Sequence, residues 1–329
     1  MFISILAAVT IMASHPKPEP LSKRATRLFS LSGNRLGGVE YPWISNSKVL
    51  RFKGDRFFSF DIPTHHETLL PDLTHQVMTA PAYSRFVDVS PTGSWIMWGK
   101  SGANPIFACP IDGAKLAQWP GNGGMTSPYW CMDGKHIAQI TFSIAGMDHS
   151  IAIVRFDKVV LRSLDATMPP ATIDPLPKGL QGLDILSVVS ANEIIARIPD
   201  KIESMSPRQS SSTSLSFTAI VTPRKVQEIS VWDLHQAQPL HRWRIAIPHQ
   251  VMSVSVSADG KNAAWITSLS DSPNGYSLWI SNIDGSGLRL LGSESNAKKA
   301  PLPMTVNWSP NKALLSYRTS DGFWIVPVK

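Results

Sequence analysis

The stretch Val251–Ser293 reads VMSVSVSADGKNAAWITSLSDSPNGYSLWISNIDGSGLRLLGS, and its pattern decides the fold. It contains four short apolar runs: Met252–Val256, Asn262–Thr267, Ser277–Ile283 and Leu288–Leu291. Short runs bounded by Gly, Asp, Asn and Ser are typical of β-strands joined by tight turns. A four-stranded unit of this size cannot bury both of its faces by itself, so the stretch predicts neighbouring copies of the same unit.

Versions of this unit recur along most of the chain. The turn before each second strand carries a serine or a cysteine, namely Ser45, Ser90, Cys131, Ser190, Ser257 and Ser309. Five of the six third strands are expected to end on an acid, namely Asp61, Asp112, Asp157, Asp233 and Asp284. A repeat of roughly 40–50 residues with four strands is typical of a β-propeller blade. Six units therefore predict an all-β, six-bladed β-propeller of four-stranded blades.

The ring has to close between its first and last units. The sixth unit offers three strand-like runs, the last at Gly322–Lys329, so its outer edge would be left with unpaired backbone groups. The segment Arg27–Leu31 precedes the first unit and matches the fourth-strand pattern of Leu288–Leu291. We therefore predict that Arg27–Leu31 supplies the outer strand of blade six, beside Phe323–Val328.

The turn motifs also resemble those of a known family. They are Ser90-Pro91-Thr92-Gly93, Asp112-Gly113, Ser257-Ala258-Asp259-Gly260, Asp284-Gly285-Ser286-Gly287-Leu288-Arg289 and Ser309-Pro310-Asn311. Together they resemble the repeat of TolB-type propellers over about residues 27–329, most closely in units two, three, five and six. This resemblance implies a six-bladed propeller that is often exported and that works by binding other proteins. It does not fix a ligand, because propellers host many unrelated functions.

The N-terminus differs in composition from the repeats. Phe2–Ala13 is apolar and uncharged, too short to span a bilayer comfortably and of the length of a signal-peptide core, although no Lys or Arg precedes it. We expect residues 1–13 to be a signal peptide or hydrophobic anchor, 14–26 a proline-rich spacer and 27–329 the propeller. Export to the periplasm or out of the cell follows from this reading, and a buried N-terminal strand is the alternative.

Composition and cysteine usage restrict the chemistry. The net charge is +7, but basic residues adjoin one another only in pairs, so no nucleic-acid partner is expected. Cys109 and Cys131 match no metal spacing, which leaves either a disulfide or two buried free thiols. No Gly-x-Ser-x-Gly nucleophile motif occurs. We therefore predict no cofactor, no metal and no catalytic residue, and a monomer that meets a membrane only through an uncleaved N-terminus.

Binding is expected on one face of the ring. In a four-stranded blade, the loops between the second and third strands share a face with the connections between blades, and here both sets are long and varied. Variable loops on a rigid scaffold are where binding usually occurs. The candidate partner-binding residues on this long-loop face are Lys100, Asn104, Asp148, His149, Arg208, Arg224, Lys225, Asp271, Asn274, Lys298 and Lys299. The insertion at residues 199–227 is read as a mobile surface loop, or alternatively as a partner-binding arm.

Two functions remain open at this stage. The first is a non-enzymatic, TolB-like scaffold that binds a protein partner in the cell envelope or outside the cell. The second is a propeller-based lyase or hydrolase with its site at the central channel. The predicted inner strands carry as charges only Glu40, Arg85 and Asp88, which favours the scaffold.

Overall fold

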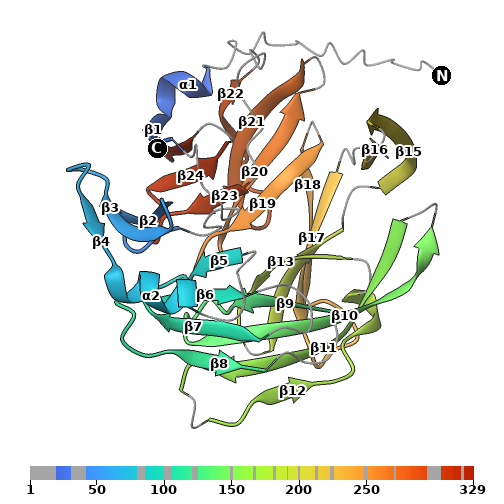
Figure 1. The fold of residues 1–329 in the computed structure, drawn as a ribbon. Helices are drawn as coiled ribbons and strands as arrows, with labels where there is room; N and C mark the ends of the chain where they lie inside the picture. The colour runs from blue at the N-terminus through green and yellow to red at the C-terminus, as the bar shows by residue number, and fades with distance from the viewer. Residues whose placement is uncertain are drawn as a thin grey trace, which may run out of the picture.

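The computed structural model describes residues 20–30, 42–79, 86–99, 105–120, 125–148, 151–165, 168–180, 183–190, 192–198, 201–211, 214–222, 226–247, 250–269, 272–294, 305–319 and 322–329. Its strands form small antiparallel sheets set around a ring (Figure 1). Six of these sheets are blades, so the predicted all-β, six-bladed propeller is confirmed. Within the described ranges, no helix has the length and apolar character needed to cross a membrane.

The blades follow the chain in order, each from its innermost to its outermost strand. Blade one has β2 (Lys48–Lys53), β3 (Arg56–Asp61) and β4 (Glu67–Leu69), with Trp43 bridged to Val49 at its inner edge. Blades two and three have β5 (Phe86–Val89), β6 (Trp95–Gly99), β7 (Ile106–Pro110), β8 (Ala117–Trp119), then β9 (Met125–Trp130), β10 (His136–Asp148), β11 (Ile151–Ser163), β12 (Ala171–Ile173). Blades four and five have β13 (Asp184–Val188), β14 (Glu193–Arg197), β17 (Val226–Asp233), β18 (His241–Ala246), then β19 (Val251–Val256), β20 (Asn262–Leu269), β21 (Ser272–Asn282), β22 (Arg289–Glu294).

Blade six joins the two ends of the chain. Its strands are β23 (Thr305–Trp308), β24 (Leu314–Arg318), β25 (Phe323–Pro327) and, outermost, the N-terminal β1 (Thr26–Phe29). In the β1–β25 ladder, Arg27 lies opposite Trp324. The predicted closure by an N-terminal strand is therefore confirmed, although the strand begins one residue earlier and ends two residues earlier than expected.

The ordered N-terminal segment reaches beyond this strand. Sequence analysis expected a spacer up to residue 26, whereas the structure has a helical turn there, α1 (Leu21–Arg24). Leu21 is buried against blades five and six, because Pro20 forms a bridge with Ser293 at the end of β22. The Arg24 guanidinium donates hydrogen bonds to the Leu291 carbonyl (2.6 Å) and to the Lys329 carbonyl (3.0 Å). Residues 1–13, the expected signal peptide or anchor, lie outside the described residues.

The hydrophobic core lies between the blades rather than inside them. Each pair of neighbouring blades shares its own cluster of buried side chains. The cluster between blades six and one includes Phe323, Phe29 and Phe60, and it completes the ring. Because every blade needs two neighbours to bury its faces, an open chain of blades would leave two apolar faces in water.

The repeated serines explain why the sequence pattern is so regular. Buried Ser257 accepts a hydrogen bond at its hydroxyl from the Asn262 amide (3.0 Å), and its carbonyl accepts one from Gly260 (2.8 Å). The Ser90 hydroxyl accepts the Trp95 amide at 3.1 Å, and the Ser309 hydroxyl accepts the Leu314 amide at 3.0 Å. The serine thus satisfies buried backbone donors at the start of the second strand, which is a structural role.

Tryptophans at the ends of inner strands connect neighbouring blades. The Trp43 indole donates to the Ser316 hydroxyl of blade six (3.0 Å). Trp130 of blade three donates to the backbone carbonyl of Asp88 in blade two at 3.3 Å. Trp308 of blade six donates to the backbone carbonyl of Ser255 in blade five at 3.1 Å. Each ring fills space between two blades while its polar N–H finds a partner, as buried tryptophan requires.

The structure corrects two local expectations. The connection from blade one to blade two, Pro71–Ser84, is among the long, varied connections that the sequence analysis treats as loops, but it contains α2 (Pro71–Thr79), whose Leu73 and Val77 pack between blades one and two. The third strand of unit three was expected to end at Asp157, whereas β11 continues to Ser163. The cause is the apolar run that follows Asp157, which keeps the chain in the ladder with β10.

The insertion in blade four is also more ordered in its backbone than a loop. Residues 201–211 and 214–222 form an antiparallel hairpin of two strands, β15 (Lys201–Ser211) and β16 (Ser214–Thr222). It is a separate sheet inserted between β14 and β17, and Figure 1 shows it standing apart from the blades. The prediction of a surface loop is therefore wrong, because the backbone of the insertion forms two paired strands. A short 3₁₀ helix, Lys178–Leu180, precedes the same blade.

Candidate functional site: the central channel

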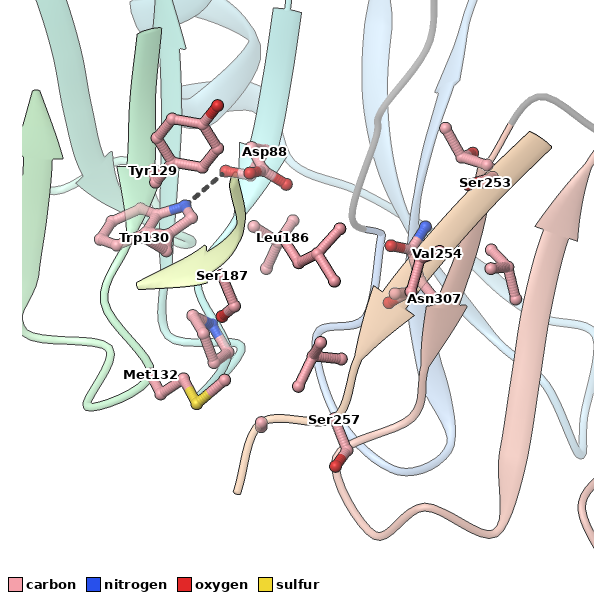
Figure 2. A pocket seen from close by; sticks show the side chains of 17 residues that line it. Asp88, Tyr129, Trp130, Met132, Leu186, Ser187, Ser253, Val254, Ser257 and Asn307 are labelled. Atoms are coloured by element: carbon pink, nitrogen blue, oxygen red, sulfur yellow. Dashed lines mark hydrogen bonds between the residues drawn. The ribbon is translucent and has the colours of Figure 1, made fainter. Parts of the chain in front are cut away.

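A cavity of about 230 Å³ lies in the channel at the centre of the ring. It is lined by residues of the inner strands of blades two to six, β5, β9, β13, β19 and β23, and by the turns that follow three of them. Figure 2 shows two facing walls. One carries Asp88, Tyr129, Trp130, Met132, Leu186 and Ser187, and the other carries Ser253, Val254, Ser257 and Asn307.

The pleat of the inner strands places Asp88 in this lining. Val87 and Val89 on either side of it are fully buried between blades, with 1% and 0% exposure. Because successive side chains of a strand point to opposite sides, the Asp88 side chain points away from that packing, and it lines the cavity together with Val89. The Trp130 indole holds the Asp88 carbonyl at 3.3 Å, so the strand that carries the carboxylate is fixed to blade three.

The cavity lies toward one mouth of the channel. Its lining includes Pro91, Met132 and Ala258, which belong to the turns between first and second strands. Those turns, together with the short turns after the third strands, form what we call the short-turn face. The sequence predicted binding on the opposite, long-loop face, so the described cavity is at the other end of the channel from the predicted partner site.

The chemistry of the lining is mildly polar. Among the described residues that line the cavity, Asp88 is the one carboxylate, and no Lys, Arg or His accompanies it. The other polar groups are hydroxyls and one amide, from Tyr129, Ser187, Ser253 and Asn307 among others. A channel with a single acid and several short hydrogen-bonding groups can hold a small polar ligand. Glu40 and Arg85, the other inner-strand charges expected from the sequence, lie outside the described residues.

The predicted partner-binding residues are placed only in part. Asp148, Arg208 and Asn274 lie in β10, β15 and β21, and their backbones alone are described. The other eight lie outside the described residues: Lys100, Asn104, His149, Arg224, Lys225, Asp271, Lys298 and Lys299. The sequence analysis did not single out the channel residues Tyr129, Ser187, Ser253 and Asn307. For Asn307 the signal is its position between two buried residues, Val306 and Trp308, on an inner strand.

Four of the five repeated acids, all except Asp157, serve turns on the short-turn face. Asp61 accepts the amide and the hydroxyl of Thr64 (3.0 and 2.7 Å), and these bonds lower the pKa of Asp61. Asp284 accepts the amide and hydroxyl of Ser286 in the same way (2.8 and 2.7 Å), and its pKa is lowered as well. A carboxylate that caps its own turn is occupied by a structural task. These acids therefore do not form a shared site.

One acid also joins two blades. Partial burial pushes the pKa of Asp259 upward, but hydrogen bonds from Lys312, Ser257 and the Lys261 amide outweigh it and lower the pKa to about 2. The Lys312 ammonium lies 2.7 Å from the Asp259 carboxylate and connects the turns of blades five and six. A second hollow of about 260 Å³ lies nearby, between the same two blades, and is lined by Asn262, Arg289 and Lys312 among others. Lys312 at its edge is already bound to Asp259.

Both cysteines are free and buried. Cys109 packs between blades one and two, whereas Cys131 packs between blades three and four, so the reading as two buried free thiols is confirmed. Burial raises the pKa of each thiol to about 12, with the nearby Asp112 and Asp133 adding to the effect. Within the described part of the chain, no group of three or more metal-binding side chains is found.

Comparison with known proteins identifies similar folds but no family for this chain. No protein-family model matches the chain, and no curated relative does. The structure is similar to the WD40 repeats of RRP9, with 11% identity, a TM-score of 0.54 and coverage of 95% of this chain and 99% of that one. It is similar to a chain of the Mitotic Checkpoint Complex, with 13% identity, a TM-score of 0.50 and 99% coverage of both chains.

An enzyme has the same architecture. Oligogalacturonate lyase from Vibrio parahaemolyticus is similar to this chain with a TM-score of 0.53, 10% identity and 93% coverage of both chains. At such low identities the likeness shows a shared fold and nothing about shared chemistry. The six-bladed ring of this chain therefore shares its general fold with the WD40 repeats of RRP9 and with an oligogalacturonate lyase.

Proposed function

We propose that this chain is a non-enzymatic, TolB-like β-propeller that acts as a protein-binding scaffold, exported to the cell envelope or beyond. The observation that carries the proposal is the difference between the two faces of the ring. On the short-turn face, connections are brief and closed by their own hydrogen bonds, as at Ser90, Ser257 and Ser309. On the long-loop face, the chain extends well past the blades.

The extensions come from three successive blades. In blade three, β10 and β11 pair from His136↔Ser163 to Asp148↔Ile151, far longer than the five-residue strands of blade two. Blade four inserts the β15–β16 hairpin, and in blade five β20 and β21 pair as far as Leu269↔Ser272. A rigid ring that presents long hairpins on one side has the architecture of a binding platform.

The alternative of an enzyme at the central channel receives less support. The repeated serines and four of the five repeated acids are engaged in turns, Asp157 accepts a hydrogen bond from Ser143 inside β11, and the described lining of the channel has Asp88 as its one carboxylate. General acid–base chemistry on a sugar polymer typically needs two cooperating groups. The TolB resemblance is supported by the Ser-x-x-Gly turns, whose serine hydroxyl and carbonyl bonds recur in blades two and five. A chain of the same fold belongs to a protein assembly, the Mitotic Checkpoint Complex.

Replacement of the blade-four hairpin tests the scaffold function. In the full chain, Lys201–Thr222 is replaced by a short Gly-Ser linker, which the geometry permits because the Ile198 amide already bonds to the Glu228 carbonyl across the base of the hairpin (3.1 Å). The matched control replaces three exposed lysines of the short-turn face, Lys115, Lys135 and Lys261, by serine.

Tagged proteins are then used for affinity capture from extracts of the source organism, and the main co-purifying protein is quantified. We expect the hairpin replacement to lose this partner and the triple-lysine variant to keep it, with both proteins melting like the wild type. If the hairpin replacement still captures the partner and the triple-lysine variant does not, the partner binds the short-turn face and the proposal is wrong. Export is tested separately by N-terminal sequencing, which should find the mature chain starting close to Ser14.

A further inference from the structure

The outermost strands of the blades differ in how open they are to a further strand. β4, β8 and β12 have three residues each, and β1 has four. β22 has six residues, but Pro20 forms a bridge with its Ser293 and the Arg24 guanidinium bonds to its Leu291 carbonyl. β18 also has six residues, and among the described strands it pairs with β17 alone. Because proteins usually shorten or cover such edges, β18 is the exception in this ring.

The hydrogen-bond pattern of blade four shows which backbone groups of β17 face β18. The Ile198 amide donates to the Glu228 carbonyl (3.1 Å), so Glu228 directs its backbone groups toward β14. Along a strand, the backbone groups of successive residues alternate between the two neighbouring strands. Ile229 and Val231 therefore direct theirs toward β18, and the Val231 carbonyl accepts the Leu240 amide (2.8 Å) in agreement with this.

The same alternation continues on β18. Trp243 lies opposite Ile229 and His241 lies opposite Val231, so the backbone groups of Trp243 and His241 point toward β17. The backbone groups that point away from the blade belong to the residues between and after them, Arg242, Arg244 and Ala246. All of these outward residues are exposed. β18 therefore presents a row of backbone donors and acceptors that an added strand can pair with.

The side chains of β18 select the chemistry of that added strand. Arg242 and Arg244 are two positions apart, so their exposed guanidinium groups lie on one side of the blade. Glu228, opposite Arg244 in the ladder, lies 4.0 Å from Arg242, which leaves two guanidinium groups for one carboxylate. On the other side, the half-buried Trp243 ring stacks with His241 at 5.5 Å between centroids. An incoming strand thus meets a cation at every second position and an aromatic surface between them.

Charge also decides between a partner protein and a second copy of this chain. Pairing of two β18 edges would bring Arg242 and Arg244 of one copy close to the same arginines of the other, and opposed like charges destabilise a sheet. An acidic segment forms ion pairs at the same positions. The net charge of +7 on the whole chain attracts such a segment as well.

We propose that β18 accepts an extended acidic segment of a partner protein as an additional outer strand of blade four. The segment carries Asp or Glu opposite Arg242 and Arg244, and between these acids an apolar side chain that packs on Trp243. Backbone bonds hold the segment, and its alternating side chains select it. β18 lies at the outer edge of the ring, so this site is separate from the partner surface on the long-loop face. Its test does not depend on the hairpin replacement.

Synthetic peptides on the full chain test the pairing. The probe is a fluorescent peptide of alternating Glu and Val with blocked ends, and its binding is followed by anisotropy in about 0.15 M salt. In the proposed register the Glu amides donate to β18, whereas the Val amides point away from it. We expect the probe to bind, N-methylation of its Val amides to preserve binding, and N-methylation of its Glu amides to abolish it.

A control peptide with Lys in place of Glu should not bind, because it meets the arginines with like charge. Equal binding of the probe and its Glu-N-methylated form would show that charge alone holds the peptide, which contradicts strand pairing. Absence of saturable probe binding would contradict the proposal as well.

Variants locate the site on β18. Arg242→Glu combined with Arg244→Glu should weaken probe binding by about tenfold or more, since two ion pairs are replaced by two repulsions. Ala246→Pro removes one outward N–H without a change in charge, and it should weaken binding in a protein that still folds, because an edge strand tolerates proline where its N–H faces solvent. The matched control, Lys135→Glu with Lys261→Glu, changes the net charge equally on the short-turn face and should retain binding.

Thermal melting of each variant checks its folding. If the lysine control weakens probe binding as much as the arginine pair does, net charge and not β18 is responsible, and the proposal is wrong.

Amide hydrogen exchange supplies a readout that charge alone does not change. The amides of Arg242, Arg244 and Ala246 should exchange rapidly in the free protein and slowly once the probe is bound, because only strand pairing gives them acceptors. Unchanged exchange at a saturating probe concentration would exclude the added strand. Light scattering without peptide should find a monomer. A dimer that forms with rising concentration and that Ala246→Pro abolishes would assign the edge to a second copy of this chain instead.

Discussion

The substitution Phe29→Ala tests how the ring is closed. Phe29 is 9% exposed and lies on β1, the strand that completes blade six. Its ring stacks on Phe323 of β25 at 5.1 Å between centroids and meets Phe60 of blade one edge-on at 5.4 Å. The Arg51 guanidinium of blade one lies 4.5 Å from the same ring centroid. One side chain from the N-terminus therefore connects the last blade to the first.

The size of the effect follows from these contacts. Truncating a buried phenylalanine to alanine costs about 3–5 kcal/mol, which includes the cavity that remains. For a chain of 329 residues the unfolding entropy is about 0.7 kcal/mol/K, so Tm should fall by about 4–7 °C. The matched control is Leu69→Ala on β4, an outer strand of the neighbouring blade, because Leu69 is 39% exposed and should shift Tm by about 1 °C or less.

The assay is thermal unfolding by circular dichroism, combined with light scattering to detect association. Deleting residues 14–33 should have a larger effect, because it removes the whole β1 ladder and exposes the edge of β25. The expected loss is comparable with the usual margin of about 5–15 kcal/mol for a folded domain. A Phe29→Ala protein that melts like the Leu69→Ala control, or a deletion that stays monomeric with unchanged Tm, would refute closure by this strand.

Three further predictions concern the frame of the propeller. The thiols of Cys109 and Cys131, whose pKa burial raises to about 12, should not react with a disulfide reagent at pH 8 in the native protein, and both should react in guanidinium. The pKa of Asp259 is lowered to about 2 in the folded state, so the contribution of its carboxylate to stability should be constant above about pH 5 and disappear as pH falls from about 4 to 2. The difference in unfolding free energy between wild type and Asp259→Asn, followed against pH, measures this contribution. Gly113→Ala should destabilise the protein by more than Gly54→Ala, because both glycines have positive φ but a Cβ at Gly113 would lie 2.5 Å from the backbone of α2.

Each of these has a result that contradicts it. Rapid labelling of one thiol without denaturant would show that its interface between blades opens easily. A stability difference for Asp259→Asn that persists unchanged down to pH 2 would mean that packing, and not the Lys312 ion pair, is responsible. Equal losses for the two glycine variants would show that backbone strain alone matters and that α2 moves aside freely.

The sequence identified the architecture because its repeats are structural necessities. Ser90, Ser257 and Ser309 recur because each hydroxyl accepts the same buried amide at the start of a second strand. Such a requirement is local, so it is visible in a single sequence. The ring closure was predictable for a similar reason, since a blade with three strands leaves one edge unpaired and β1 had no other place in the pattern.

Other features depend on contacts that a single sequence does not display. The helix α2 was missed because Leu73 and Val77, four residues apart, form its whole buried stripe within a segment that looked like a loop. The end of β11 was misplaced because Asp157 sits where the repeat acid was expected, although it accepts a hydrogen bond from Ser143 inside the ladder. The channel lining draws residues from five blades, and only the closed ring brings them together.

The central claim is that a protein partner binds the long-loop face, and photo-crosslinking tests it most directly. A photoreactive amino acid is placed singly at Asp148, Arg208 or Asn274 on that face, and at Lys115, Lys135 or Lys261 on the short-turn face, in the full chain expressed in the source organism. We expect the first set to crosslink to one common protein and the second set not to do so. Crosslinks to a common protein from the short-turn set alone would contradict it.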